Sequence, residues 1–322
     1  MEKSKVSVIM ANYNKAKYLP ESIESVLCQT YENLELIIID DCSSDDSKKI
    51  VDHYARKDCR IYPIFDDKRK GSAPSRNQGL KVASGEYIAI LDSDDISLPN
   101  RLETQYNFLE RYPEFFLVGS GAMDINKDGK KIRVKRPLAN ELKLRKRLAK
   151  GNMIYHSTIM FRNEKGNYYR EKFVYSQDYD FYLTMLSKGK RLINIPDILI
   201  KYRVTTNAIS CNESESTMQM LFALRARDFY HQRLRNGKDL YDEFDPNEIL
   251  GLNVEKSEDK KVLYLAMRSR FRADNFKKVK EICKRYFTQY GYLNKVLVYY
   301  IASFLGKRAI GFIRKMKWTV LP

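Results

Sequence analysis

Apolar and polar residues alternate in blocks along the first hundred positions of the chain. Continuous apolar runs of four to seven residues are typical of strands buried on both faces, and we predict strands at residues 6–11, 34–39, 61–65 and 87–91. The segments between them have the apolar spacing of amphipathic helices, and we predict helices at residues 18–29, 45–56 and 73–83. Because strands and helices alternate, we expect an α/β fold with a doubly wound, mostly parallel sheet.

Two acidic clusters each follow directly on a predicted strand. The first cluster is Asp40-Asp41, and the second is Asp92-Ser93-Asp94-Asp95. Carboxylates this close raise one another's pKa, so they share protons, pair with a base or bind a divalent cation. Since ligands bind outside the carboxyl ends of the strands in such sheets, we expect one shared site at which Mg²⁺ or Mn²⁺ holds a diphosphate. The alternative is an acidic loop that caps a helix starting near Leu98.

Five motifs give the first two hundred residues a family resemblance. The motifs are residues 6–14, 39–41, 71–79, 85–89 and 92–95. In this order and spacing they resemble the family 2 glycosyltransferases, over about residues 4–205 of this chain. The resemblance implies the GT-A fold, a Rossmann-like doubly wound and mostly parallel sheet, followed here by a C-terminal helical extension. It also implies an inverting enzyme with Mn²⁺ or Mg²⁺ as cofactor.

The resemblance assigns roles to residues around the nucleoside of a sugar donor. Asp41 would accept the N3 hydrogen of uracil, a role that needs an ionised acceptor fixed at a strand end. Asp40 would support Asp41 or touch the ribose. Ala11 and Tyr13 would line the nucleoside pocket from the loop after the first strand.

Other residues would hold the phosphates and the metal. Arg76 would reach a phosphate or Asp92, since a guanidinium can hold two oxygens at once; the alternative is a solvated helix residue that pairs with Asp67. Arg203, at the start of a loop over residues 202–210 that closes over the donor, would contact the diphosphate. The second acidic cluster would share ribose contact and metal coordination, and the sequence leaves open which oxygen binds the metal. The assigned donor contacts are Asp92, Ser93 and Asp94, and the assigned metal ligands are Asp92, Asp94 and Asp95.

The acceptor side of the resemblance centres on Asp178, as the base for the acceptor hydroxyl. Relatives usually carry Glu-Asp just before a helix here, and Gln177 replaces the Glu beside the acceptor. Asp180 competes for the role of base, and the alternative is that both acids only cap the helix predicted at 179–188. His156 stands where relatives often carry a His beside the acceptor or the diphosphate; otherwise it is a structural residue.

Length and composition indicate a large enzyme domain with an appendage. The 322 residues, 43% of them hydrophobic, can bury a large core and are long for one domain. We expect a nucleotide-sugar-binding half at 1–115, an acceptor-binding half at 116–210 and a helical, basic extension at 211–322. Three histidines offer no zinc site, and the five cysteines show no metal or disulfide spacing. No signal peptide opens the sequence, so we expect a cytoplasmic location.

The net charge of +17 is concentrated in two segments. Residues 127–150 contain eleven Lys or Arg against two acids, and residues 284–322 contain eight against none. The apolar run 296–305 is too short to cross a bilayer, which takes about twenty residues. With Lys, Arg, Trp and Tyr around it, such a helix can lie in the interface of an anionic membrane. We therefore weigh peripheral binding at the inner face of the cell membrane against packing on the catalytic domain or in a homo-oligomer.

These patterns and the resemblance together predict an inverting, metal-dependent glycosyltransferase. It would move a sugar from a nucleotide donor, UDP-linked, to a hydroxyl of a lipid-linked or growing glycan in cell-surface polysaccharide synthesis. A nucleic-acid-binding module would explain the basic charge but not the acids at strand ends, so we expect no nucleic acid partner. A sugar-nucleotide nucleotidyltransferase would share the sheet and the metal. It would, however, open with a Gly-rich loop where this chain has Asn12-Tyr13-Asn14-Lys15.

Overall fold

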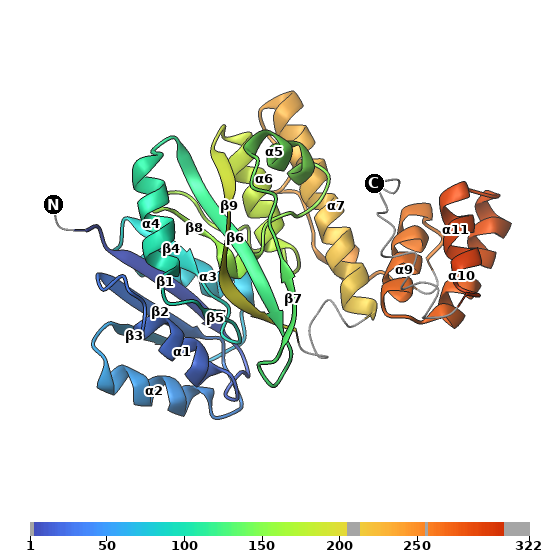
Figure 1. The fold of residues 1–322 in the computed structure, drawn as a ribbon. Coiled ribbons are helices and arrows are strands. Elements are labelled where there is room, and N and C mark those ends of the chain that lie inside the picture. The colour runs from blue at the N-terminus through green and yellow to red at the C-terminus, as the bar shows by residue number, and fades with distance from the viewer. Residues whose placement is uncertain (1–2, 205–212, 255–256, 306–322) are drawn as a thin grey trace. The chain divides into compact units, whose positions relative to one another are not determined.

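The computed structural model describes residues 3–204, 213–254 and 257–305 (Figure 1). The chain divides into two compact units. The first unit contains residues 1–205 and 229–239, and the second contains residues 206–228 and 240–322. The first unit therefore includes the predicted nucleotide-sugar-binding half and nearly all of the predicted acceptor-binding half.

The N-terminal part of the sheet is parallel, as the sequence predicts. Its strands are β1 (Val6–Asn12), β2 (Leu34–Asp40), β3 (Ile61–Phe65) and β4 (Tyr87–Ile90). β1 lies between β2 and β4, and β3 extends the sheet beyond β2. The apolar runs form the core, with Val8, Leu36 and Ile38 fully buried. The connections are α1 (Leu19–Leu27), α2 (Ser47–Lys57) and α3 (Ser72–Val82), close to the predicted helices.

The remaining strands make the sheet mixed. They are β5 (Ile96–Ser97), β6 (Phe115–Ile125), β7 (Lys131–Lys135), β8 (Met160–Arg162) and β9 (Arg191–Arg203). Within residues 3–204 the strand order is β3-β2-β1-β4-β8-β6-β9-β5, and β7 pairs with β6. β8 runs antiparallel to both β4 and β6 and so joins the two halves, while β6 and β9 are parallel. One continuous sheet thus carries both predicted halves (Figure 1).

The segment after the second acidic cluster differs from the sequence prediction. The helix expected near Leu98 is α4 (Arg101–Arg111), because β5 comes first and pairs with β9. Asn100 occupies the N-cap position of α4. The alternative that the acidic loop caps this helix is therefore wrong, and the cluster needs another explanation.

Three further helical elements complete the part of the first unit that precedes residue 205. They are α5 (Glu141–Leu148), the 3₁₀ turn η1 (His156–Thr158) and α6 (Gln177–Ser187). Asn140 caps α5 by accepting the Lys143 N–H, which favours a helix start at this point. The predicted helix at 179–188 is α6, and it starts two residues earlier than expected.

The C-terminal helical extension is confirmed. Its helices are α7 (Glu213–Asn236), whose last residues belong to the first unit, α8 (Asn247–Leu250), α9 (Lys260–Arg272), α10 (Phe276–Tyr290) and α11 (Asn294–Ala302). Asp259 and Asn275 cap α9 and α10. Met267, Cys283 and Val296 lie in the small core of α9, α10 and α11.

Two sequence predictions concern residues that the structure does not describe. The predicted closing loop lies outside the described residues from position 205 onward, and so does the basic segment 306–322 that contains Trp318. In the described part of the chain, every helix is too short or too polar to span a bilayer.

Candidate active site

The first acidic cluster lies at the carboxyl end of β2, beside the end of β1. Asp40 is buried and accepts hydrogen bonds from Asn12 Nδ2 at 2.7 Å and from the Ser43 N–H at 2.9 Å. Asp41 is also buried, and its two carboxylate oxygens accept the N–H groups of Lys70 at 2.6 Å and Gly71 at 2.9 Å. Both acids are therefore fixed in place by the loops around them.

A glycine at position 71 allows the backbone turn that directs its N–H to the Asp41 carboxylate. Gly71 has φ +96°, a left-handed conformation that side chains disfavour. Beside it, the Arg69 guanidinium lies 4.1 Å from the centre of the Tyr13 ring. Ala11, the other residue assigned to the nucleoside pocket, is on β1, which pairs with β2. The predicted nucleoside residues thus gather around the ends of two adjacent strands.

The second acidic cluster follows β4, on the other side of β1, and binds two cations. Arg76 is buried on α3 and donates from Nη2 to Asp92 Oδ1 at 2.8 Å. Lys15 Nζ lies 2.5 Å from Asp94 Oδ2. Burial alone would raise the pKa of Asp92, but Arg76 outweighs it and the pKa is lowered. The alternative pairing of Arg76 with Asp67 is therefore wrong.

Arg76 retains hydrogen-bonding capacity. Its Nε and Nη1 atoms are buried and donate to no protein atom among the described residues. Its guanidinium also lies over the Tyr169 ring, 5.9 Å from the centre. Because unsatisfied buried donors are costly, these N–H groups are candidates for a bound anion.

Asp95 and Arg203 lie behind the acidic loop. Asp95 is buried and accepts the Arg203 N–H at 2.8 Å, and burial together with the charges of Asp94 and Asp92 raises the pKa of Asp95. Arg203 donates from Nε to the Asp94 carbonyl at 2.9 Å and from Nη2 to Glu21 Oε2 at 2.6 Å. In this structure Arg203 thus connects the loop to α1, and its contact with a diphosphate stays a prediction.

Ser93 is buried in the same loop. The Ser22 hydroxyl on α1 donates to its carbonyl oxygen at 2.9 Å and contacts the Asp95 carbonyl oxygen at 2.7 Å. These contacts hold the backbone between Asp92 and Asp95 against α1. The loop is therefore ordered by its carbonyl groups, which leaves the Asp92 and Asp94 side chains as its polar face.

Two side chains of the second acidic cluster remain as candidate metal ligands. The described residues include no group of three or more His, Cys, Asp or Glu side chains arranged to hold a metal ion. Asp95 is directed at Arg203, which leaves Asp92 and Asp94 as the candidate ligands. Mg²⁺ is commonly bound by only one or two carboxylates together with substrate phosphates. Two hard oxygen donors beside the free N–H groups of Arg76 fit that pattern.

Asp178 is placed to exchange a proton, whereas Asp180 is not. Asp178 is partly exposed at the start of α6, next to Gln177, and accepts a hydrogen bond from Asn152 Nδ2 at 2.7 Å. Burial raises the pKa of Asp178 above its usual value, although the charge of Arg76 opposes this shift. Asp180 is fully buried in an ion pair with Arg170. Of the two competing acids, only Asp178 is available to a substrate.

His156 is held between two tyrosines. Its Nδ1 lies 2.8 Å from the Tyr182 hydroxyl, and its Nε2 lies 3.2 Å from the Tyr169 hydroxyl. Burial, followed by the charge of Arg76, lowers the pKa of His156 to about 3. The imidazole is therefore neutral at physiological pH, and its low pKa makes it a poor proton acceptor.

A chain of contacts connects these distant residues. The Arg76 guanidinium donates to Asp92 and lies over the Tyr169 ring. The Tyr169 and Tyr182 hydroxyls both contact His156, and Tyr182 is on α6, the helix that begins with Gln177 and Asp178. Burial raises the pKa of Tyr202, and smaller contributions come from the charges of Asp95, Asp92, Asp94 and Asp178. Tyr202 also packs against Tyr155, with ring centres 5.7 Å apart.

Four residues of this site were not predicted from the sequence. They are Lys15, Asn152, Tyr169 and Tyr182. Lys15 lies in the loop after the first strand, but no sequence pattern predicts that it pairs with Asp94, 79 positions away. The other three carry no sequence signal, since each contact depends on how loops fold back onto the sheet.

Comparison with known proteins identifies the family. The family described as Glycosyl transferase family 2 matches residues 7–170, just over half of the chain. An uncharacterized glycosyltransferase of Methanocaldococcus jannaschii, MJ1057, is 36% identical over 63% of this chain and 72% of its own length. WfgD of Escherichia coli, named as a UDP-Glc:alpha-D-GlcNAc-diphosphoundecaprenol beta-1,3-glucosyltransferase, is 35% identical over 65% of this chain and 80% of its own.

A solved structure is similar in fold. TarS of S. aureus (residues 1–349), crystallised with UDP-GlcNAc, aligns with a TM-score of 0.54 at 17% identity, over 93% of this chain and 89% of that one. This likeness supports the predicted GT-A architecture of a mostly parallel sheet with helices. The family match and the sequence relatives show that the chain belongs to glycosyl transferase family 2 and is a glycosyltransferase.

Proposed function

We propose that this enzyme is an inverting, metal-dependent transferase that moves a sugar from a UDP-linked donor to a hydroxyl of a lipid-linked or growing glycan. The proposal is carried by the chain of contacts from Asp92 through Arg76, Tyr169 and His156 to α6, the helix at whose start Asp178 lies. The acceptor class is supported by relatives such as WfgD, and by TuaG of Bacillus subtilis, a putative teichuronic acid biosynthesis glycosyltransferase that is 32% identical.

The donor is held from both sides of β1. The Asp41 oxygens each accept one backbone N–H, and a carboxylate has further lone pairs for the N3 hydrogen of uracil. Tyr13 lies beside that position. On the other side, the free N–H groups of Arg76 donate to a phosphate oxygen of the donor.

Asp92 and Asp94 would hold the divalent ion, Mn²⁺ or Mg²⁺, and a bound ion would supply Lewis-acid chemistry that neutralises charge on the departing diphosphate. Lys15 pairs with Asp94 and Arg76 pairs with Asp92. The Arg76 guanidinium helps to hold the pKa of Asp92 below its usual value.

Asp178 deprotonates the acceptor hydroxyl as it attacks the anomeric carbon from the face opposite the diphosphate. A base works best when its pKa approaches the working pH, and burial raises the pKa of Asp178 in that direction. Asn152 orients the carboxylate through Oδ2. The neutral His156 and the ion-paired Asp180 do not compete for the proton.

A panel of nucleotide sugars tests the reaction. The full chain is incubated with each donor and Mn²⁺, and release of the nucleoside diphosphate is measured with and without glycan acceptors. We expect UDP release from one UDP-sugar, and a product whose anomeric configuration is inverted relative to the donor. Release of pyrophosphate, or a retained anomeric configuration, contradicts the proposal.

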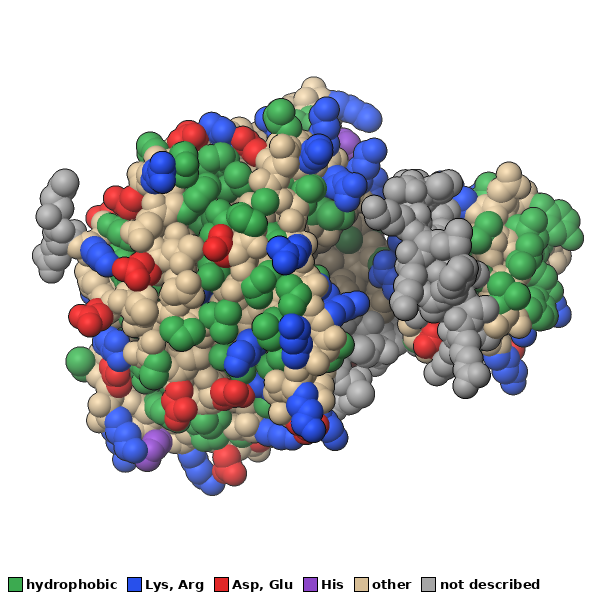
Figure 2. Space-filling view, viewed as in Figure 1, with side chains coloured by type: hydrophobic (Ala, Val, Ile, Leu, Met, Phe, Trp, Pro, Cys, Tyr) green, Lys and Arg blue, Asp and Glu red, His purple; other side chains and the backbone are tan. Residues whose placement is uncertain are grey.

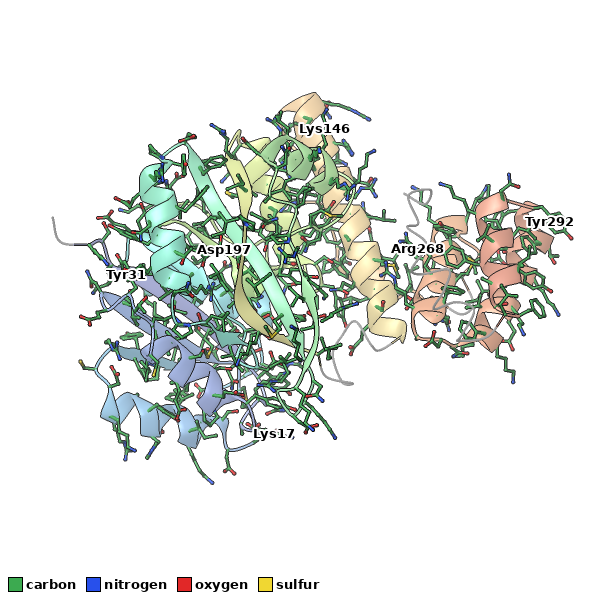
Figure 3. All side chains as sticks on the ribbon, viewed as in Figure 1. Lys17, Tyr31, Lys146, Asp197, Arg268 and Tyr292 are labelled. Atoms are coloured by element: carbon green, nitrogen blue, oxygen red, sulfur yellow. The ribbon has the colours of Figure 1, made fainter. Side chains whose placement is uncertain are left out.

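The proposal includes peripheral binding of the C-terminal unit to the inner face of the cell membrane. An apolar patch is exposed on and around α11, and consists of Tyr292, Val298, Ile301, Phe304 and Leu305. Hydrophobic side chains gather over α10 and α11 in Figure 2, and Tyr292 projects from the end of this unit in Figure 3. Tyr292 is 82% exposed and Phe304 is 59% exposed.

Cations border the apolar patch. Lys277, Lys280 and Lys284 share one side of α10 by their spacing, and Lys280 Nζ lies 4.0 Å from the centre of the Phe304 ring. Apolar groups ringed by lysines suit an anionic lipid surface, where each basic residue contributes about 1 kcal/mol.

Vesicle flotation tests the membrane proposal. We expect the protein to float with phosphatidylglycerol vesicles, and Ile301→Asp with Phe304→Asp to abolish flotation. Leu142→Asp is the matched control, since Leu142 is 70% exposed on α5 in the first unit. Unchanged flotation of the double variant contradicts the proposal. If the wild-type protein is a dimer and the double variant is a monomer, the result supports a homo-oligomer contact instead.

A further inference from the structure

A cavity of about 200 Å³ lies within the C-terminal unit, and its lining is mostly charged. The lining residues are Val254, Arg270, Lys278, Glu281, Ile282 and Arg285. Three of the six are cations and one is an acid, so the lining carries an excess of two positive charges. All six residues belong to the C-terminal unit, and none has a role in the reaction proposed above.

The helical spacing on α10 shows why the charges gather there. Positions 278, 281, 282 and 285 follow the i, i+3, i+4, i+7 pattern and share one side of the helix. The helix packs into its own small core through Val279, Cys283 and Tyr286 instead. The cavity-lining side of α10 therefore adjoins its core-packing side, and Ile282 belongs to both.

Arg270, on α9, contributes a buried guanidinium to the same cavity. Arg270 is 3% exposed, and its Nη1 donates to Thr217 Oγ1 at 2.9 Å, with Thr217 also fully buried. A second cation lines the same small space, since Arg285 Nη2 donates to the Ser257 carbonyl oxygen at 2.7 Å.

These hydrogen bonds hold both guanidinium groups before any ligand arrives. Thr217 fixes one and the Ser257 carbonyl fixes the other, so a ligand need not order them. Guanidinium groups bind phosphate oxygens through paired N–H groups, and Lys278 adds a point charge. The excess of two positive charges matches a diphosphate better than a single carboxylate.

From this lining we propose that the cavity binds the phosphate or diphosphate group of a ligand. The inference rests on the proposed function in one respect, that a lipid-linked acceptor would bring a diphosphate to this unit. A free diphosphate has the same chemistry, so the two sources have to be separated by experiment. In either case the C-terminal unit binds an anion by itself, apart from the donor site at β1, β2 and β4.

Isothermal titration of the full chain tests the proposal. The titrations use inorganic pyrophosphate, farnesyl diphosphate and farnesol, with EDTA present so that divalent metal does not support binding at the donor site. We expect both diphosphates to bind and farnesol to bind at least tenfold more weakly than farnesyl diphosphate. Tighter binding of farnesyl diphosphate than of pyrophosphate identifies the lipid source, and equal binding identifies the free anion.

Charge variants assign the binding to this cavity. Arg285→Gln and Lys278→Gln should each weaken pyrophosphate binding about tenfold, equivalent to about 1.4 kcal/mol. Lys261→Gln is the matched control, because Lys261 is exposed on α9 and does not line the cavity. Circular dichroism confirms that each variant is folded, and having two independent variants guards against misfolding of either one.

Several results would overturn the proposal. They are no diphosphate binding, binding that both cavity variants leave unchanged, an equal loss in Lys261→Gln, and farnesol binding as tightly as farnesyl diphosphate. UDP release during sugar transfer to a soluble acceptor is measured in the same variants. This measurement separates failure of the cavity proposal from failure of the proposed function. Loss of the cavity should leave that release unchanged, while an inactive wild type would reject the transferase proposal alone.

Discussion

Asp178 and Asp180 lie two residues apart, yet the structure predicts different consequences for their removal. Asp178 is partly exposed and accepts one hydrogen bond from Asn152. Asp180 is fully buried and ion-paired with Arg170, which also pairs with Asp239 at 2.7 Å. We expect Asp178→Asn to abolish transfer and leave the fold intact. Asp180→Asn should destabilise the fold and spare the turnover of the molecules that remain folded.

The magnitudes follow from what each carboxylate contacts. Loss of a general base slows a reaction by about 10²–10⁴-fold, which corresponds to about 3–5 kcal/mol of activation free energy. Breaking a buried ion pair costs about 3–5 kcal/mol of folding free energy. We expect about 3 kcal/mol for Asp180→Asn, the lower end of that range, because Arg170 keeps Asp239. In a unit of this size, such a loss lowers Tm by about 6–12 °C.

Three measurements on each variant separate the two roles. UDP release with acceptor reports catalysis, calorimetric titration with UDP reports donor binding, and thermal unfolding by circular dichroism reports stability. Asp197→Asn is the matched control, since Asp197 is exposed on β9. If Asp178→Asn keeps a tenth or more of the wild-type rate, Asp178 is not the base. An Asp180→Asn variant that melts like wild type would refute the stability argument.

Three further outcomes are expected. Because burial lowers the pKa of His156 to about 3, the unfolded chain takes up a proton near pH 6.5 that the folded protein excludes. The free energy of unfolding, measured by urea titration, should therefore fall by up to about 1.4 kcal/mol per pH unit below pH 6.5. His156→Gln should flatten this dependence on pH, and an equal slope in the variant counts against the role of His156. Gly71→Ala should cost about 1–2 kcal/mol at φ +96° and weaken calorimetric UDP binding through Asp41, and unaltered affinity would contradict this. EDTA should stop UDP release and Mn²⁺ should restore it, with Asp94→Asn requiring more Mn²⁺; release without metal argues otherwise.

The parallel part of the fold was readable from the sequence, and the rest was not. Apolar runs predict β1 to β4; β1, β2 and β4 are buried on both faces, and β3, at the edge of the sheet, is partly buried. β5 has two residues and β8 has three, so neither carries a usable pattern. Their positions depend on pairing with strands far along the chain, such as β9. The start of α4 was misplaced for the same reason, because β5 takes the residues just before Leu98.

For the site, the sequence located the acids but not their partners. Strand-end positions placed Asp41 and Asp92 at a common edge of the sheet. The choice between Asp178 and Asp180 needed the structure, because only the fold brings Arg170 against Asp180. Arg203 was predicted as a ligand of the diphosphate, and its contact with Glu21, 182 positions away, could not be anticipated.

The contacts of Arg203 have a mechanical consequence. Arg203 ends β9, and it is bonded to Asp95, to the Asp94 carbonyl and to Glu21 on α1. Each such hydrogen bond to a charged group contributes about 1.5–3 kcal/mol. Swinging the acceptor side of the domain away from the donor side would break all of them together. The acceptor and donor sides of the domain are therefore connected through this arginine, and we expect substrates to enter and leave by rearrangement of loops.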